Sequence, residues 1–244
     1  MRYSIRLCFF VLVIASSCNA DKNTKTNSSK KSTPTEKTEI IDEAPKVQIP
    51  SSGTETKDLS HIKTLEQEEL MPFLKKYATK NPETRIQIET EYGNIIVQLF
   101  EEPVFHRANF IRLAKLGYFD TCVFHRVDPE FVAQAGNSDR VMTRDYRSAI
   151  GRYLIPSEYT NKYKHEYGAF AAAKYKKQNV SNASSPFEFY IVTKKDGAHH
   201  LDGEHTVFGK VMEGMDVAEK ISKVETDNSE WPISNIDMNV KVLN

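Results

Sequence analysis

Short runs of alternating apolar and polar residues occupy most of the chain from Arg85 onward. Two of them, "RIQIET" and "NIIVQLF", flank the turn signal "EYGN" and predict a β-hairpin. Further strands are predicted at "CVFHRV", "FVAQA", "YGAFAAA", "FEFYIVT" and "HTVFGKV". The final stretch, "NIDMNVKVL", places Ile236, Met238, Val240 and Val242 on one face of a strand.

Two segments among these strands have helical spacing instead. "EPVFHRANFIRLAKLGYF" carries Pro103 in its first turn and Gly117 at its end, with an apolar stripe formed by Phe105, Ala108, Phe110, Leu113 and Ala114. "MDVAEKISKV" places Val217, Ile221 and Val224 on one side. Many short strands with two helices predict a mainly β fold, a closed barrel whose ends the helices cover.

The residues before this region divide into two parts. Residues 18–60 are rich in Ser, Thr, Lys and Glu and predict a disordered tether, because they cannot bury enough apolar surface to offset ordering. Residues 61–80 predict a helical extension, either packed on the domain or forming a short stalk. Pro72 is expected to end or kink a continuous helix there.

The first residues are typical of a bacterial secretory signal. Two arginines precede an apolar run over residues 7–14, which is too short for a stable membrane span, and small residues lead to Cys18. The ending "IASSC" resembles a lipobox, although Ala15 stands where Leu is usual. We therefore expect a lipoprotein signal peptide at 1–17, lipidation of Cys18 and anchoring in the bacterial cell envelope, facing periplasm or exterior. The alternative is an ordinary signal peptide cut after Ala20.

Charge and cysteine content narrow the possible chemistry. The 244 residues carry 33 basic and 33 acidic side chains without a long basic run, so we expect no nucleic-acid partner and a monomer. With Cys18 lipidated and Cys8 removed, Cys122 stands alone, which excludes an intramolecular disulfide and favours a core residue. No cysteine–histidine spacing indicates a metal site.

The stretch "VFHRVDPEFVAQAGN" puts polar groups into two apolar strands joined by the turn signal Asp-Pro. Arg126 could point to solvent and Gln134 could lie at a strand end. Strict alternation places His125 on the face opposite Arg126 and Phe124, in a structural role.

Together, "VFHRVDPEFVAQAGN", "GAFAAAK", "FEFYIVT" and "HHLDGEHTVFGKV" resemble the cyclophilin-type peptidyl-prolyl isomerases over residues 84–244. The resemblance implies an eight-stranded antiparallel barrel with two capping helices and an active site on its outer face. It implies catalytic roles for Arg126 and Gln134. The substrate-binding positions that it implies are Phe131, Ala173, Lys174, Tyr190, Leu201 and His205.

The implied function is isomerisation of X–Pro bonds in exported or envelope proteins, assisting their folding, with no cofactor. The alternative is a catalytically weak module that binds proline-containing segments at the envelope. It is motivated by Lys174 and Glu188, where the family usually has Asn and Gln; Glu188 is expected to add a negative charge near the pocket. Ala135 and Asn137 also depart from the family's Gln-Gly-Gly-Asp, and His200 stands where cyclosporin-sensitive members commonly have Trp.

Overall fold

The computed structural model describes residues 57–175 and 181–244. The predicted signal peptide, Cys18 and the tether up to residue 56 lie outside the described residues. Within the described ranges there are nine strands, four α-helices and two 3₁₀ turns. Their bounds are α1 Gln67–Lys80, β1 Arg85–Thr90, β2 Gly93–Leu99, α2 Val104–Lys115, η1 Phe119–Thr121, β3 Val123–Asp128, β4 Val132–Asn137, α3 Val141–Ile150, β5 Ala169–Ala172, β6 Phe189–Val192, η2 His199–Leu201, β7 Val207–Glu213, α4 Met215–Ser222, β8 Ile236–Asp237 and β9 Asn239–Leu243. None of the helices in these ranges has the length and apolar character needed to cross a bilayer.

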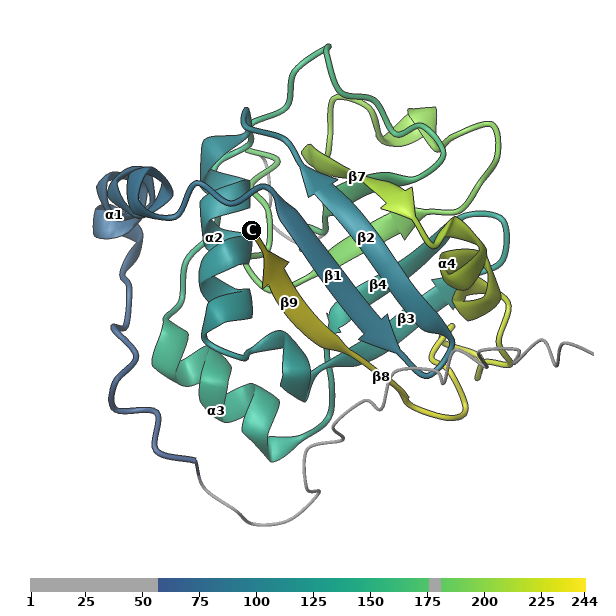
Figure 1. The fold of residues 1–244 in the computed structure, drawn as a ribbon, viewed down its shortest axis with the longest axis horizontal. Coiled ribbons are helices and arrows are strands. Elements are labelled where there is room, and N and C mark those ends of the chain that lie inside the picture. Colours follow the sequence, from purple (N-terminus) through teal and green to yellow (C-terminus); the bar gives the residue numbers. More distant parts are fainter. Residues whose placement is uncertain (1–56, 176–180) are drawn as a thin grey trace, which may run out of the picture. The chain divides into compact units, whose positions relative to one another are not determined.

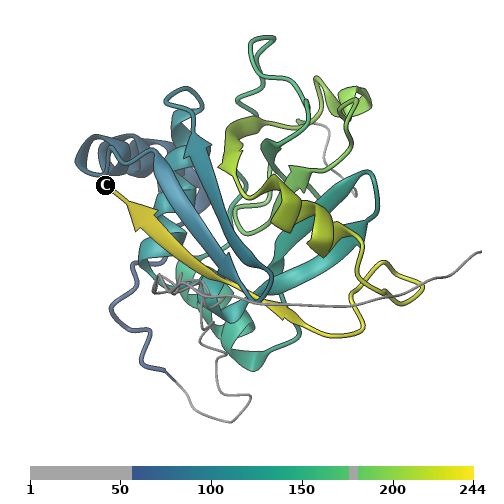
Figure 2. The same ribbon diagram turned by 45° about the vertical axis from the view of Figure 1, so that its right-hand side comes forward.

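All described strands belong to one antiparallel sheet, which curves into a nearly closed barrel. The strand order is β8-β3-β4-β6-β5-β7-β2-β1-β9, so its two edges are β8 and β9. These are successive parts of one C-terminal segment, which pairs with β3 at one end and with β1 at the other (Figure 2). The predicted barrel is therefore confirmed. It has nine described strands instead of the expected eight because the last predicted strand is divided at Met238.

Helices α2 and α4 lie on opposite sides of strands β1 and β2 (Figure 1). The expected stripe of α2 enters the core, with Ala108, Phe110 and Leu113 buried. Polar residues on its other faces are buried as well, because α1, the residues before it and loop residues such as Glu158 and Pro186 cover them. The Arg112 guanidinium, for example, donates to the Lys63 carbonyl at 2.6 Å.

The extension packs onto the domain through α1 and the residues before it. Leu65, Leu70 and Leu74 are fully buried in the main core. The Leu65 N–H donates to the Ile150 carbonyl at 3.0 Å, which ties the extension to the end of α3. Of the two outcomes expected at Pro72, an end or a kink of the helix, the first is wrong, since Pro72 lies inside α1. Burial of the leucines on both sides of Pro72 offsets the backbone hydrogen bond that proline cannot donate.

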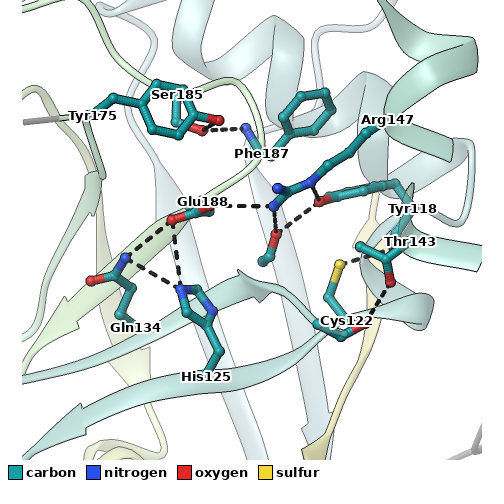
Figure 3. A network of polar contacts seen from close by, with 12 residues as sticks. Tyr118, Cys122, His125, Gln134, Thr143, Arg147, Tyr175, Ser185, Phe187 and Glu188 are labelled. Atoms are coloured by element: carbon teal, nitrogen blue, oxygen red, sulfur yellow. Dashed lines mark hydrogen bonds and ion pairs between the residues drawn. The ribbon is translucent and has the colours of Figure 1, made fainter. Parts of the chain in front are cut away.

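Helix α3 is absent from the sequence-based prediction, although its pattern contains a signal. Thr143, Tyr146 and Ile150 are its buried residues, at spacings of three and four. The helix follows β4 and presents Arg147 toward the polar network shown in Figure 3.

Apolar residues form two clusters on the two faces of the sheet. Along β5 and β6, Phe170, Phe189 and Ile191 point into the barrel core. The alternate residues Ala171 and Tyr190 belong to a second, smaller cluster. Because strand side chains alternate, this second cluster lies on the outer face of the barrel.

Candidate active site

A groove of about 640 Å³ lies over this second cluster. The eight residues predicted for the site all line it, from elements far apart in the sequence. Four residues that sequence reasoning did not assign to the site also line it: Val132, Tyr175, His200 and Glu204. The ring of His200 stacks on Phe131 with centroids 5.4 Å apart, so it forms part of the groove wall.

The register of β3 and β4 brings Arg126 and Gln134 together as direct cross-strand partners. A register shift between Phe124 and Arg126 interrupts the strict alternation of β3. Phe124 is consequently buried in the core while Arg126 lines the groove. The expectation that these two share a face is therefore wrong. The same shift brings His125 Nε2 to 3.4 Å from Gln134 Nε2. The expectation that His125 lies on the face opposite Arg126 is therefore wrong as well.

Arg126 is held by an acidic residue from a distant loop. Its Nε lies 2.6 Å from Glu230 Oε2, and its guanidinium carbon lies 5.7 Å from the Phe131 ring centroid. Asp128 Oδ2 also lies 3.9 Å from Nη2, a distance too long for a hydrogen bond, so both Nη groups keep donor capacity. With 34% of the side chain exposed, the guanidinium remains accessible to a bound peptide.

Tyr190 forms the buried floor of the groove, and its hydroxyl is satisfied from behind. Asp202 Oδ1 lies 2.7 Å from His165 Nδ1, and a carboxylate only accepts, so Nδ1 carries the proton. His165 Nε2 then accepts from the Tyr190 hydroxyl at 2.9 Å. Burial lowers the pKa of His165, which keeps this neutral form. The tyrosine thus keeps an apolar ring toward the groove.

His205 stands at the side of the floor with its ring edge-on to Tyr190, at a centroid distance of 5.7 Å. Its Nδ1 donates to the Ala172 carbonyl at 3.1 Å, so the neutral ring keeps Nε2 as an acceptor. Burial lowers the pKa of His205 to about 4. The residue is therefore an uncharged hydrogen-bonding group at neutral pH.

The two charged departures from the family pattern are paired within the protein. Lys174 Nζ donates to Asn182 Oδ1 at 2.8 Å and to Glu204 Oε2 at 3.0 Å. The negative charge expected from Glu188 is paired with Arg147, with Oε1 3.3 Å from Nη2 (Figure 3). Neither charge is therefore unbalanced beside the groove.

The altered turn next to Gln134 keeps its one essential glycine. Gly136 has φ +99°, and a Cβ there would lie 2.1 Å from the Phe187 carbonyl oxygen. A side chain at this position would force β4 away from the strand that follows Phe187. Ala135 and Asn137 on either side keep ladder pairings in β3–β4.

Cys122 is fully buried, and burial raises the pKa of its thiol to about 12. A thiol with this pKa is protonated at neutral pH and is a poor nucleophile. The residue belongs to the main core cluster, away from the groove lining.

Three supporting residues escaped sequence reasoning for different reasons. Asp202 lies inside the quoted motif "HHLDGEHTVFGKV", which is a usable signal for it. His165 and Glu230 lie in loops without periodic pattern, and only the closed barrel brings them behind Tyr190 and beside Arg126.

Comparison with known proteins gives a consistent result. The family described as cyclophilin type peptidyl-prolyl cis-trans isomerase/CLD matches residues 85–242. A peptidyl-prolyl cis-trans isomerase-like 2 protein from Rhizopus delemar is 37% identical over 148 residues, which are 60% of this chain and 26% of that protein. A peptidyl-prolyl cis-trans isomerase from Schizosaccharomyces pombe is 30% identical over 149 residues, 61% of this chain and 91% of that protein.

Solved structures show the same fold. A cyclophilin-type isomerase from Cryptosporidium parvum superposes with a TM-score of 0.54 at 21% identity, covering 66% of this chain and 98% of the other. A cyclophilin from Hirschia baltica gives 0.52 at 16% identity, covering 66% and 74%.

Proposed function

The chain belongs to the cyclophilin-type peptidyl-prolyl cis-trans isomerase family, and from that membership we propose that its groove catalyses rotation about X–Pro peptide bonds. The observation that carries the proposal is the placement of Arg126 and Gln134 beside the apolar floor formed by Tyr190, within one groove. Phe131 and Leu201 line the same groove and supply apolar surface for a proline ring.

The chemistry requires stabilisation of a twisted amide. Rotation breaks amide conjugation, which gives a barrier of roughly 18–20 kcal/mol. In the twisted state the prolyl nitrogen regains a lone pair, to which the Arg126 guanidinium can donate a hydrogen bond. This lone pair is delocalised in the planar ground state, so the bond stabilises the transition state selectively. Glu230 orients the guanidinium through Nε, and no covalent bond is made or broken.

The test is a coupled isomerisation assay with a proline-containing peptide, using the chain from residue 57 onward and its Arg126→Ala variant. We expect clear turnover by the parent and a loss of at least tenfold in the variant. Peptide binding without turnover would instead identify a binding module. Lys174 and Glu188, the two residues that motivated that alternative, are each paired within the protein, with Glu204 and with Arg147.

The proposed setting of the activity is the bacterial cell envelope, with exported or envelope proteins as substrates and folding assistance as the role. It is supported by the apolar run over residues 7–14, the Cys18 context and the polar stretch that follows. Labelling cells with a radioactive fatty acid tests it. The parent should become labelled and Cys18→Ala should not; a labelled Cys18→Ala protein contradicts the anchor.

A further inference from the structure

Glu188 stands directly before β6, at the centre of a polar cluster behind the groove (Figure 3). Its Oε1 lies 3.3 Å from Arg147 Nη2, and its Oε2 lies 3.2 Å from Gln134 Nε2. His125 Nε2 completes the cluster at 3.6 Å from Oε2. The Glu188 side chain is 13% exposed, so these groups take the place of water around the carboxylate.

A carboxylate at this position restricts Gln134 in a way that an amide cannot. An ionised carboxylate only accepts hydrogen bonds, so the NH₂ end of the Gln134 amide must face Glu188. The amide oxygen then points away from Glu188, as Figure 3 shows. A glutamine at 188 could donate or accept and would permit both orientations of the Gln134 amide.

Arg147 keeps Glu188 both charged and in place. Its Nε donates to the Tyr118 hydroxyl at 2.8 Å and its Nη2 to the Gly136 carbonyl at 2.9 Å. Its guanidinium carbon also lies 4.9 Å from the Phe187 ring centroid. Burial acts to raise the pKa of Glu188, but His125 and Arg147 lower it by more, so the pKa lies below its ordinary value.

We propose that Glu188 and Arg147 are positioning residues that hold the Gln134 amide with its oxygen toward the groove, an inference that rests on the proposed isomerase function. Gln134 thereby presents an acceptor to a peptide N–H or to the donors of its cross-strand partner Arg126. The acceptor is set before substrate arrives, so no binding energy is spent on turning the amide. Arg147 comes from α3, whose end is tied to the extension through Ile150 and Leu65.

The kinetic test compares Glu188→Gln with Asp145→Asn. The control makes the same carboxylate-to-amide change on α3, where Asp145 is 40% exposed and faces Arg144 at 3.7 Å. We expect Glu188→Gln to lower kcat about tenfold with KM changed less than twofold, which corresponds to losing one oriented hydrogen bond. Asp145→Asn should retain both constants. An unchanged kcat in Glu188→Gln overturns the proposal, whether or not the thermal midpoint of the variant falls.

A second measurement does not depend on turnover. The Gln134 side-chain amide is assigned in ¹⁵N-edited NMR spectra by its disappearance in Gln134→Met. In the parent its protons should exchange slowly with water, and Glu188→Gln should shift the resonances and speed their exchange. Rapid exchange of the Gln134 amide protons in the parent, or resonances that Glu188→Gln does not shift, would refute the positioning role, whether or not the parent is active. A protected amide in an inactive parent would refute only the isomerase function.

Discussion

Removing the hydroxyl oxygen of Tyr190, which lies behind the groove floor, should lower the stability of the protein and leave its isomerase activity nearly unchanged. In Tyr190→Phe the ring that faces the groove remains, and the hydroxyl that satisfies His165 Nε2 at 2.9 Å is lost. The His165 side chain is 0% exposed, so water does not replace the lost donor. A buried acceptor without a partner costs about 1–3 kcal/mol, and we expect a loss of about 2 kcal/mol in the free energy of unfolding.

Urea denaturation at pH 7 measures this loss. With a slope of about 2 kcal/mol per M, the midpoint should fall by about 1 M. Tyr159→Phe is the matched control, because its exposed hydroxyl contacts Asn161 and should contribute less than about 0.5 kcal/mol. Peptide isomerisation by folded Tyr190→Phe should stay within twofold of the parent. An unchanged midpoint refutes the role given to His165, and a large loss of kcat/KM shows that the hydroxyl itself serves the reaction.

Three further predictions concern pH, the extension and inhibition. The pKa values of His165 and His205 in the folded protein lie below 6.5, so the unfolded chain takes up protons first as the pH falls. The free energy of unfolding should therefore be highest above about pH 6.5 and decrease toward pH 4. Equal urea midpoints at pH 7.5 and 4.5 would contradict this. Leu74→Ala empties a fully buried position in α1 and should cost about 2–5 kcal/mol in urea unfolding, whereas a loosely attached stalk would give almost none. His200→Trp should bind cyclosporin about tenfold more tightly than the parent, since indole covers on the order of 60 Å² more apolar surface; equal inhibition of both proteins would refute the argument.

Periodicity alone was sufficient for most of the scaffold. The strand "RIQIET" coincides with β1, and the helix carrying Phe110 corresponds to α2. Such segments are readable because one face of each is buried, which imposes a period on the sequence. Helix α3 carries a similar spacing of buried residues, although the sequence-based prediction contains no helix there. The start of α1 at Gln67 and its passage through Pro72 depend on packing against α2, which local pattern does not report.

The candidate site shows the same division. The identities of Arg126, Gln134 and Tyr190 as site residues followed from short motifs, because these motifs resemble those of the cyclophilin-type isomerases. The motifs did not predict which face of the sheet each side chain occupies. One register shift in β3 reversed the expected faces of Phe124 and His125, since a shift of one residue moves a side chain across the sheet.

Motifs in the sequence were enough to predict the family, and the spacing of apolar residues was enough to predict the barrel, because both depend on residue type and local pattern. The balance of charges around the groove became visible only in the folded chain. The sequence predicted a negative charge from Glu188 near the pocket, and the structure pairs that charge with Arg147, 41 residues away. Likewise Glu230 reaches Arg126 across 104 residues. Pairings of this kind depend on loop paths and barrel closure, which are global properties of the fold with no local period or motif.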